Sequence, residues 1–140
     1  MTKINWKRVV VGGLAAGLLM NLSQIVLNVF AFARESEEAL NRMNLQPAGG
    51  GAIAFFLVDT FLIGILLVWL YRAIRPAYGS GPKTALLIGL VMAFLVRIIP
   101  SINFGAFGMF PVWLLFVAGL WGLIEVVLAA LLGAWLYQEA

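Results

Sequence analysis

The sequence predicts an all-α membrane protein, with four transmembrane helices in a bundle formed by one integral membrane domain over residues 1–140. Of the 140 residues, 64% are hydrophobic and 11% are charged, and the mean hydropathy is +1.04. These values lie far outside those of soluble globular domains. Four apolar stretches hold most of the chain, and each has the ~20 residues with which a helix crosses the hydrocarbon core. They are too long, and alternate too little, for a closed β-barrel.

The first expected span, about 9–33, follows a basic start and contains Gly13-Leu-Ala-Ala-Gly17, a spacing that lets another helix approach closely. A signal peptide cleaved after Ala33 is the competing interpretation, but the apolar region is longer than the apolar core of a typical signal peptide. The second span, about 51–71, contains one ionisable residue, Asp59. Because bulky side chains share the helical face of Asp59, this helix should pack less closely than the others.

The third span, about 84–104, contains Arg97 and, shortly after it, Pro100. Proline has no backbone N–H, so the carbonyl of Val96 should lose its helical partner beside a buried cation. An ordinary kink near a helix end fits the same residues equally well. The fourth span, about 111–137, contains Glu125 as its ionisable residue.

The connections between the spans differ in length and character. Residues 36–45 form either a short interfacial helix capped by Ser36, which could cover the outer mouth of a cavity, or only a polar connection. A glycine run at residues 49–51 gives a flexible entry to the second span. The segments 78–82 and 104–111 are expected to be a tight inner turn and a short outer turn.

The basic residues predict that both termini lie on the cytoplasmic side. Loops on that side carry an excess of Lys and Arg, and Trp and Tyr gather at the interfaces, as they do at the predicted inner ends of these spans. We therefore expect an integral protein of a bacterial inner membrane. The residues assigned to the inner side are Lys3, Lys7, Arg8, Arg72, Arg75 and Lys83; those in the first, outer connection are Arg34 and Arg42.

The chain reads as two tandem copies of a helical hairpin, at about 9–72 and 84–138. A shift of 66 residues lays 57–71 over 123–137 with six identities among fifteen pairs, and it places Asp59 on Glu125. A weaker match at a shift of 76 places Asn21 on Arg97. Both copies would begin on the inner side, which predicts parallel repeats with pseudo-twofold symmetry along the membrane normal. Chance similarity between apolar helices is the alternative.

Four polar residues are expected at one depth inside the membrane. Asn21, Asp59, Arg97 and Glu125 each lie thirteen or fourteen residues from a polar or charged residue at the same end of their span. At about 1.5 Å per residue, that distance is roughly 20 Å, beyond easy reach of the headgroups. Further polar side chains share these helical faces. The candidate ligand- or ion-binding residues are Asn21, Gln24, Asn28, Asp59, Arg97, Ser101 and Glu125.

The charges of this layer allow three interpretations. One acid can pair with Arg97, which leaves the other protonated, solvated or occupied by a cation. Such a carboxylate suits a protein that transports or binds a small solute in a proton- or cation-linked manner. Alternatively, both acids bind Arg97 in a purely structural triad. The third interpretation is a non-catalytic accessory subunit of a larger membrane complex.

Several other classes are not expected. The chain has no cysteine and no histidine, which removes thiolate chemistry, imidazole-ligated haem and most zinc sites. We expect no metal site, no cofactor and no catalytic residue, and because neither acid has a recognisable catalytic flank we do not expect an enzyme. The net charge of +3 follows from the inner–outer asymmetry. The expected partners are the lipid bilayer and a second copy or a larger membrane complex, with no nucleic acid.

Overall fold

The computed structural model describes residues 3–137, and within that range every regular element is helical. Four helical rods, Trp6–Ala31, Gly50–Tyr78, Pro82–Ala106 and Val112–Leu136, are long and apolar enough to cross a membrane. The predicted all-α class, with four helices long and apolar enough to cross a membrane, is therefore confirmed. The elements in order are α1 (Trp6–Val26), the π-helical turn η1 (Leu27–Ala31), α2 (Ala33–Arg42), α3 (Gly50–Tyr78), α4 (Pro82–Ala93), the π-helical turn η2 (Phe94–Ile98), α5 (Ile99–Ala106) and α6 (Val112–Leu136).

The second helix extends further than its apolar run. It was expected to end near residue 71, but α3 continues to Tyr78 and ends at Gly79, whose φ of 82° is a conformation that favours glycine. Arg72 is only 7% exposed, so the helix still packs against the bundle just beyond its apolar run, whereas Tyr78 at its end is 66% exposed. Hydropathy marks the part of a helix that lipid can cover, not the whole helix.

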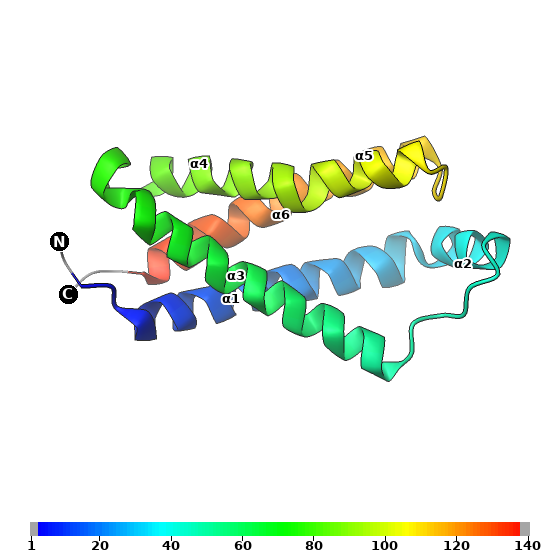
Figure 1. Cartoon of the computed structure of the whole chain (residues 1–140), viewed down its shortest axis with the longest axis horizontal. Coiled ribbons are helices and arrows are strands. Elements are labelled where there is room, and N and C mark those ends of the chain that lie inside the picture. Colours follow the sequence, from blue (N-terminus) through cyan, green and yellow to red (C-terminus); the bar gives the residue numbers. More distant parts are fainter. Residues whose placement is uncertain (1–2, 138–140) are drawn as a thin grey trace.

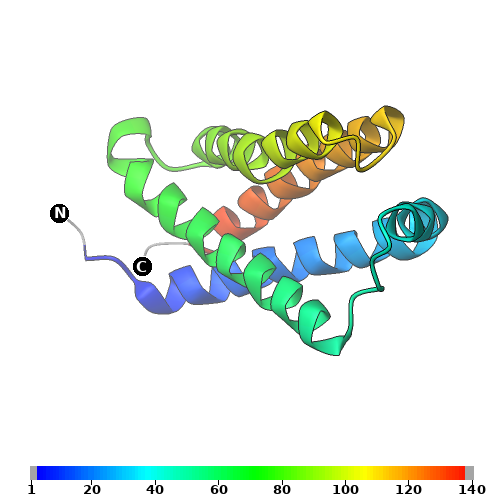
Figure 2. The same cartoon turned by 45° about the vertical axis from the view of Figure 1, so that its right-hand side comes forward.

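The four rods form two pairs of adjacent helices. α1 packs against α3, α4 packs against α6, and α1 also packs against α6. Figures 1 and 2 show α3 crossing α1 at a steep angle, so that its first half points away from the rod formed by α4, η2 and α5. Within residues 3–137, α3 contacts α4 but neither η2 nor α5. The bundle is therefore closed at the end where α1 begins and open at the other.

Glycines produce the crossing of α1 and α3. A Cβ at Gly64 would collide with the carbonyl oxygen of Gly13 and would lie 2.7 Å from the amide nitrogen of Gly17. Small residues at such a crossing let two backbones touch, which is a main source of helix association in lipid. The second helix is the least buried of the four spans, as expected, but at this crossing it packs closely, because Gly64 and not the face of Asp59 meets α1.

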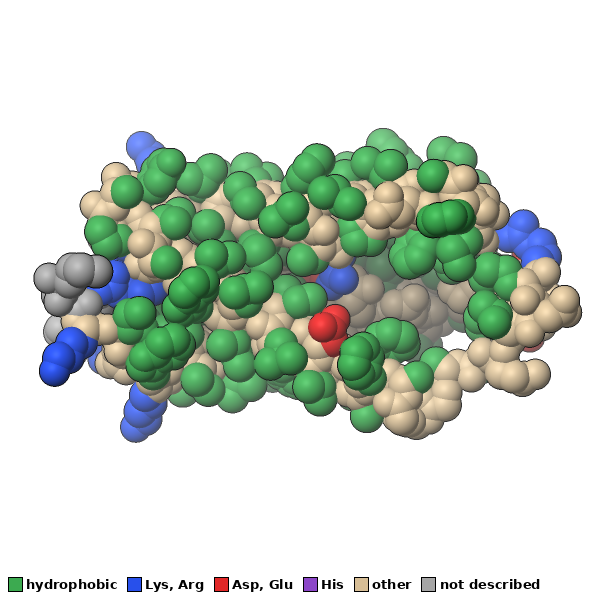
Figure 3. Space-filling view, viewed as in Figure 1, with side chains coloured by type: hydrophobic (Ala, Val, Ile, Leu, Met, Phe, Trp, Pro, Cys, Tyr) green, Lys and Arg blue, Asp and Glu red, His purple; other side chains and the backbone are tan. Residues whose placement is uncertain are grey.

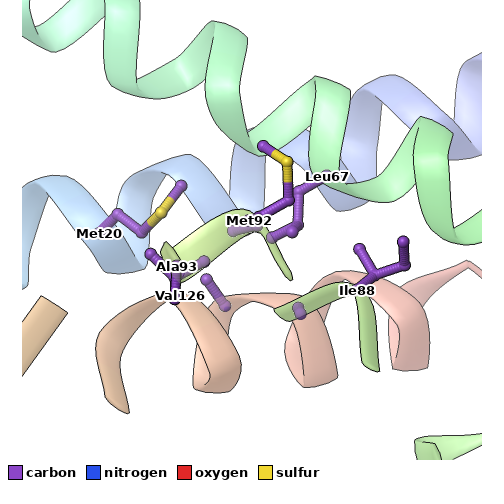
Figure 4. Close-up of a cluster of buried hydrophobic side chains, with 9 residues drawn as sticks. Met20, Leu67, Ile88, Met92, Ala93 and Val126 are labelled. Atoms are coloured by element: carbon purple, nitrogen blue, oxygen red, sulfur yellow. The ribbon is translucent and has the colours of Figure 1, made fainter. Parts of the chain in front are cut away.

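The main hydrophobic cluster lies beside this crossing and includes Ala16, between Gly13 and Gly17, and Leu67, three residues after Gly64. Met20 of α1, Leu67 of α3, Met92 of α4 and Val126 of α6 are each at most 3% exposed and belong to one cluster. Figure 4 shows these side chains converging between the helices. Small residues such as Ala129 complete the cluster, and their size lets α4 and α6 approach closely.

The first connection contains a helix, α2, which agrees with one of the two interpretations of the sequence. It begins at Ala33, so Ser36 lies inside the helix and the expectation that Ser36 caps it is wrong. Phe32 occupies the capping position and is 5% exposed. Its burial fixes where the chain turns, and the pair Arg34–Glu38, with 2.9 Å between Nε and Oε1, is exposed at the surface.

The tight turn between α3 and α4 connects the two hairpins. Gly79 and Gly81 have φ angles of 82° and 128°, which other residues rarely adopt. The hydroxyl of Thr84 donates to the carbonyl of Gly79 at 2.8 Å, and the Gly81 N–H donates to the hydroxyl of Tyr71 at 3.1 Å. The polar groups of the turn therefore bond within the protein.

The crossing provides a first prediction. Gly64→Ala should lower the free energy of unfolding in mixed micelles by about 1–3 kcal/mol, the usual cost of overpacking. Gly51→Ala is the matched control in the same helix, because a Cβ there meets nothing within 4 Å. Equal stability of the two variants in an SDS titration would contradict the role assigned to the glycine crossing.

Candidate functional site

A buried ion pair lies at the centre of the polar layer. Glu125 of α6 is 3% exposed, and its Oε1 accepts a hydrogen bond from Nη2 of Arg97 at 2.7 Å. Its Oε2 accepts from Nε2 of Gln24 at 2.8 Å. Both carboxylate oxygens therefore have strong donors, and the three side chains join α1, η2 and α6. Charge-assisted bonds of this length are among the strongest in proteins.

Two features of the backbone make room for Arg97. A Cβ at Gly122 would lie 2.6 Å from Cγ of Arg97, so the aliphatic part of the arginine passes through space that only glycine leaves open. Arg97 also lies in the π-helical turn η2, where the N–H of Ile99 donates to the carbonyl of Phe94. The irregularity expected before Pro100 is therefore a widened turn that contains Arg97 itself. Such π turns are rare and are frequent at functional sites.

The amides of α1 bond in the same region. Nδ2 of Asn21 donates to the carbonyl of Leu57 at 3.2 Å, which ties α1 to α3 two residues before Asp59. Nδ2 of Asn28 donates to the carbonyl of Gln24 at 2.8 Å. Asn28 lies in the π-helical turn η1, as Arg97 lies in η2.

Asp59 differs from Glu125. It is exposed, and within residues 3–137 it makes neither a hydrogen bond nor an ion pair. Of the two acids, only Glu125 binds Arg97, so the buried triad that the charges also allowed is not formed. Asp59 borders the same groove as Arg97, but among residues 3–137 no donor bonds to its carboxylate.

Asp59 borders a groove of about 590 Å³ between α1 and the first half of α3. Arg97 reaches the groove from η2, and Phe56 and Thr60 border it beside Asp59. Figure 3 shows a hollow on this face, with an acidic and a basic side chain close together at its edge and apolar side chains around them. The lining residues are Asn21, Gln24, Ile25, Asn28, Val29, Ala48, Ile53, Phe56, Leu57, Asp59, Thr60 and Arg97.

A second cavity of about 210 Å³ lies on the other side of Arg97, towards α2 and α5. Ser101, Phe32 and Ser36 border it together with Arg97. Ser101 therefore faces this smaller cavity and not the groove. Of the seven candidate residues, five line the groove, Ser101 lines the second cavity, and Glu125 lies behind Arg97 as its partner.

Sequence reasoning missed several participants. Thr60 borders the groove, and its hydroxyl donates to the carbonyl of Phe56 at 2.9 Å. Nε1 of Trp121 donates to the hydroxyl of Ser23 at 2.8 Å, a further polar link between α6 and α1. Thr60 follows Asp59 directly, and that adjacency was the available signal. Nothing in the sequence indicated Trp121, because its partner depends on how α6 and α1 are rotated about their axes.

Comparison with known proteins gives no assignment: no family model, curated protein or solved structure matches the chain.

The unequal environments of the two acids provide a second prediction. Glu125→Ala leaves the charge of Arg97 without a partner and should cost about 3 kcal/mol, the lower end for breaking a buried ion pair, because the Arg97 side chain keeps 21% exposure. Asp59→Ala should leave the free energy of unfolding unchanged within about 0.5 kcal/mol, as for other exposed positions. The measurement is an SDS titration of both variants. A larger loss for Asp59→Ala than for Glu125→Ala would contradict the pairing.

Proposed function

We propose that the chain transports or binds a small solute in a proton- or cation-linked manner, with Asp59 as the exchanging carboxylate. The single observation that carries this proposal is that the two acids have different environments. Glu125 is neutralised by Arg97, whereas Asp59 borders a groove with no partner among the described residues. A carboxylate at membrane depth that the protein itself does not neutralise can hold either a proton or a cation.

The position of the groove supports the exchange of a proton or a cation at Asp59. Asn21 bonds to α3 at Leu57, and Asp59 follows within the same turn of helix. The outer half of α3 contacts neither η2 nor α5, so this half can move relative to the α4–α5 rod without breaking the core. Rocking of one helical unit about a fixed site is the usual means of alternating access in carriers.

Currents in reconstituted liposomes test this function. On a solid-supported membrane, a pH step should give a transient current that Asp59→Asn removes and Asp59→Glu retains, because only a group that binds the proton carries its charge. The matched control is Glu37→Gln, which removes an exposed acid of α2. Steps in Na⁺ and K⁺ concentration show which cation is linked.

Currents that are the same for wild type and Asp59→Asn would overturn the proposal. So would a pH step that gives no more current than empty liposomes.

The orientation and the repeat belong to the same proposal. We place both termini of this integral protein in the cytoplasm of a bacterium, with the chain in the inner membrane; α1 begins and α6 ends at one end of the bundle. The two hairpins, 9–72 and 84–138, are proposed to be parallel repeats related by a pseudo-twofold axis. Asp59 and Glu125 on their second helices support this symmetry, whereas the π-helical turns Leu27–Ala31 and Phe94–Ile98 do not coincide at the shift of 76 that places Asn21 on Arg97.

Because the chain has no cysteine, single cysteines can report the orientation. Asn41→Cys in α2 should react with an impermeant maleimide in intact cells. Ser80→Cys in the inner turn should react only after permeabilisation, since both residues are exposed but are predicted on opposite sides. The reverse pattern of labelling would contradict cytoplasmic termini.

A second candidate function is that of a non-catalytic accessory subunit in a larger membrane complex, or of one copy in a homo-oligomer. The outer half of α3 favours it, because Phe55 and Val58 are 68% and 58% exposed on the face that no other described helix covers. Such a face can bind a further helix through van der Waals packing. Native purification in mild detergent distinguishes the two, since a stoichiometric partner supports the accessory function.

A further inference from the structure

The charges that line the groove determine which charge a ligand should carry. Arg97 and Glu125 cancel as a pair with 2.7 Å between Nη2 and Oε1. Nε of Arg97 is buried and has no hydrogen-bond partner among residues 3–137; since it has no accessible surface, a ligand in the groove cannot reach it. Asp59 is then the one lining charge that the described part of the protein does not compensate. A cation complements this groove, and an anion does not.

The hydrogen-bonding groups select a ligand that donates. Asn21, Gln24 and Asn28 border the groove, and each already donates through its amide nitrogen. Their amide oxygens accept no hydrogen bond within residues 3–137. The hydroxyl of Thr60 also donates into the protein, at 2.9 Å to the carbonyl of Phe56. Each amide keeps a second N–H, so the amides alone fit either kind of ligand; the carboxylate of Asp59, which only accepts, together with the free amide oxygens matches an N–H-bearing cation.

The remaining residues that line the groove are mainly apolar and favour a ligand with an apolar body. Ile25, Val29, Ile53 and Leu57 line the groove, and Phe56 lies three residues before Asp59 on the same helical face. An aromatic ring beside a carboxylate adds cation–π attraction for an ammonium group. The volume of about 590 Å³ lies within the range of about 300–1,000 Å³ typical of small-molecule sites.

The groove also opens sideways. α3 contacts neither η2 nor α5, and Ile53 and Phe56 are 50% and 60% exposed. In a helix that crosses a membrane, this exposure faces lipid. A ligand with an apolar body can therefore enter from the bilayer without first crossing the core of the protein.

From these observations we infer that the groove binds a hydrophobic ammonium ion, an amine with an apolar or aromatic body, whose N–H groups bond to Asp59 and to the amide oxygens of α1. The inference rests on the proposed function and names its solute. It assigns Asp59 as the residue that recognises the charge and Phe56 as the residue that packs against the body.

Three probes of one shape test this inference. The purified chain in detergent is titrated with 2-(1-naphthyl)ethylammonium, with the neutral alcohol 2-(1-naphthyl)ethanol, and with the anion 1-naphthylacetate, and heat is measured. The ammonium ion should bind saturably and the alcohol roughly ten- to hundredfold more weakly, as expected for loss of a charged hydrogen bond. Asp59→Asn should reduce ammonium binding to the level of the alcohol, and Asp59→Glu should restore it. Glu37→Gln, outside the groove, should change nothing.

Equal affinity for the ammonium ion and the alcohol, a preference for the anion, or no saturable binding of any probe would overturn the inference; the last is expected if a protein partner fills the groove. Asp59-dependent currents without a preference for the amine would overturn the ligand class and leave the proposed function standing. Selective binding of the amine without currents would support the binding site and contradict the proposed transport.

Discussion

The buried ion pair between Arg97 and Glu125 is the interaction on which the rest of the polar layer depends. A charge at membrane depth is costly unless a partner satisfies it, and here Gln24 completes the carboxylate's hydrogen bonds. The pair in turn constrains three helices. It needs a glycine at 122 to admit the arginine, a widened turn at residues 94–98, and an amide of α1 facing α6.

The groove follows from two separate constraints. The glycine crossing holds the middle of α3 against α1, while the absence of contact with η2 and α5 leaves the first half of α3 apart from the opposite rod. Asp59 lies in this half, two residues beyond the carbonyl that Asn21 binds. Packing against one neighbour but not the other therefore produces a space with a carboxylate at its edge. The buried hydrophobic cluster takes its α3 residue, Leu67, from beyond this crossing, so it does not include the first half of α3.

Hydropathy and composition were sufficient to predict the four spans and the grouping of the polar residues, because helix rise fixes depth along an axis. Five of the seven candidates line one groove. Which acid binds Arg97 was not predictable, since rotation and tilt are set by packing between helices, as the Gly64 crossing shows. Ser36 was assigned to the wrong position because burial of Phe32, a tertiary contact, decides where α2 begins. The end of α3 was missed because its last turns are helical without being apolar.

Carbodiimide labelling tests the central distinction between the two acids most directly, since the apolar reagent reaches carboxyl groups that face lipid or an apolar groove. The reagent is added to the protein in liposomes, and modified residues are identified by mass spectrometry. We expect modification of Asp59 and protection of Glu125, which Arg97 and Gln24 hold on both oxygens. Modification of Glu125 at a rate equal to or above that of Asp59 would contradict the assignment of Asp59 as the available carboxylate.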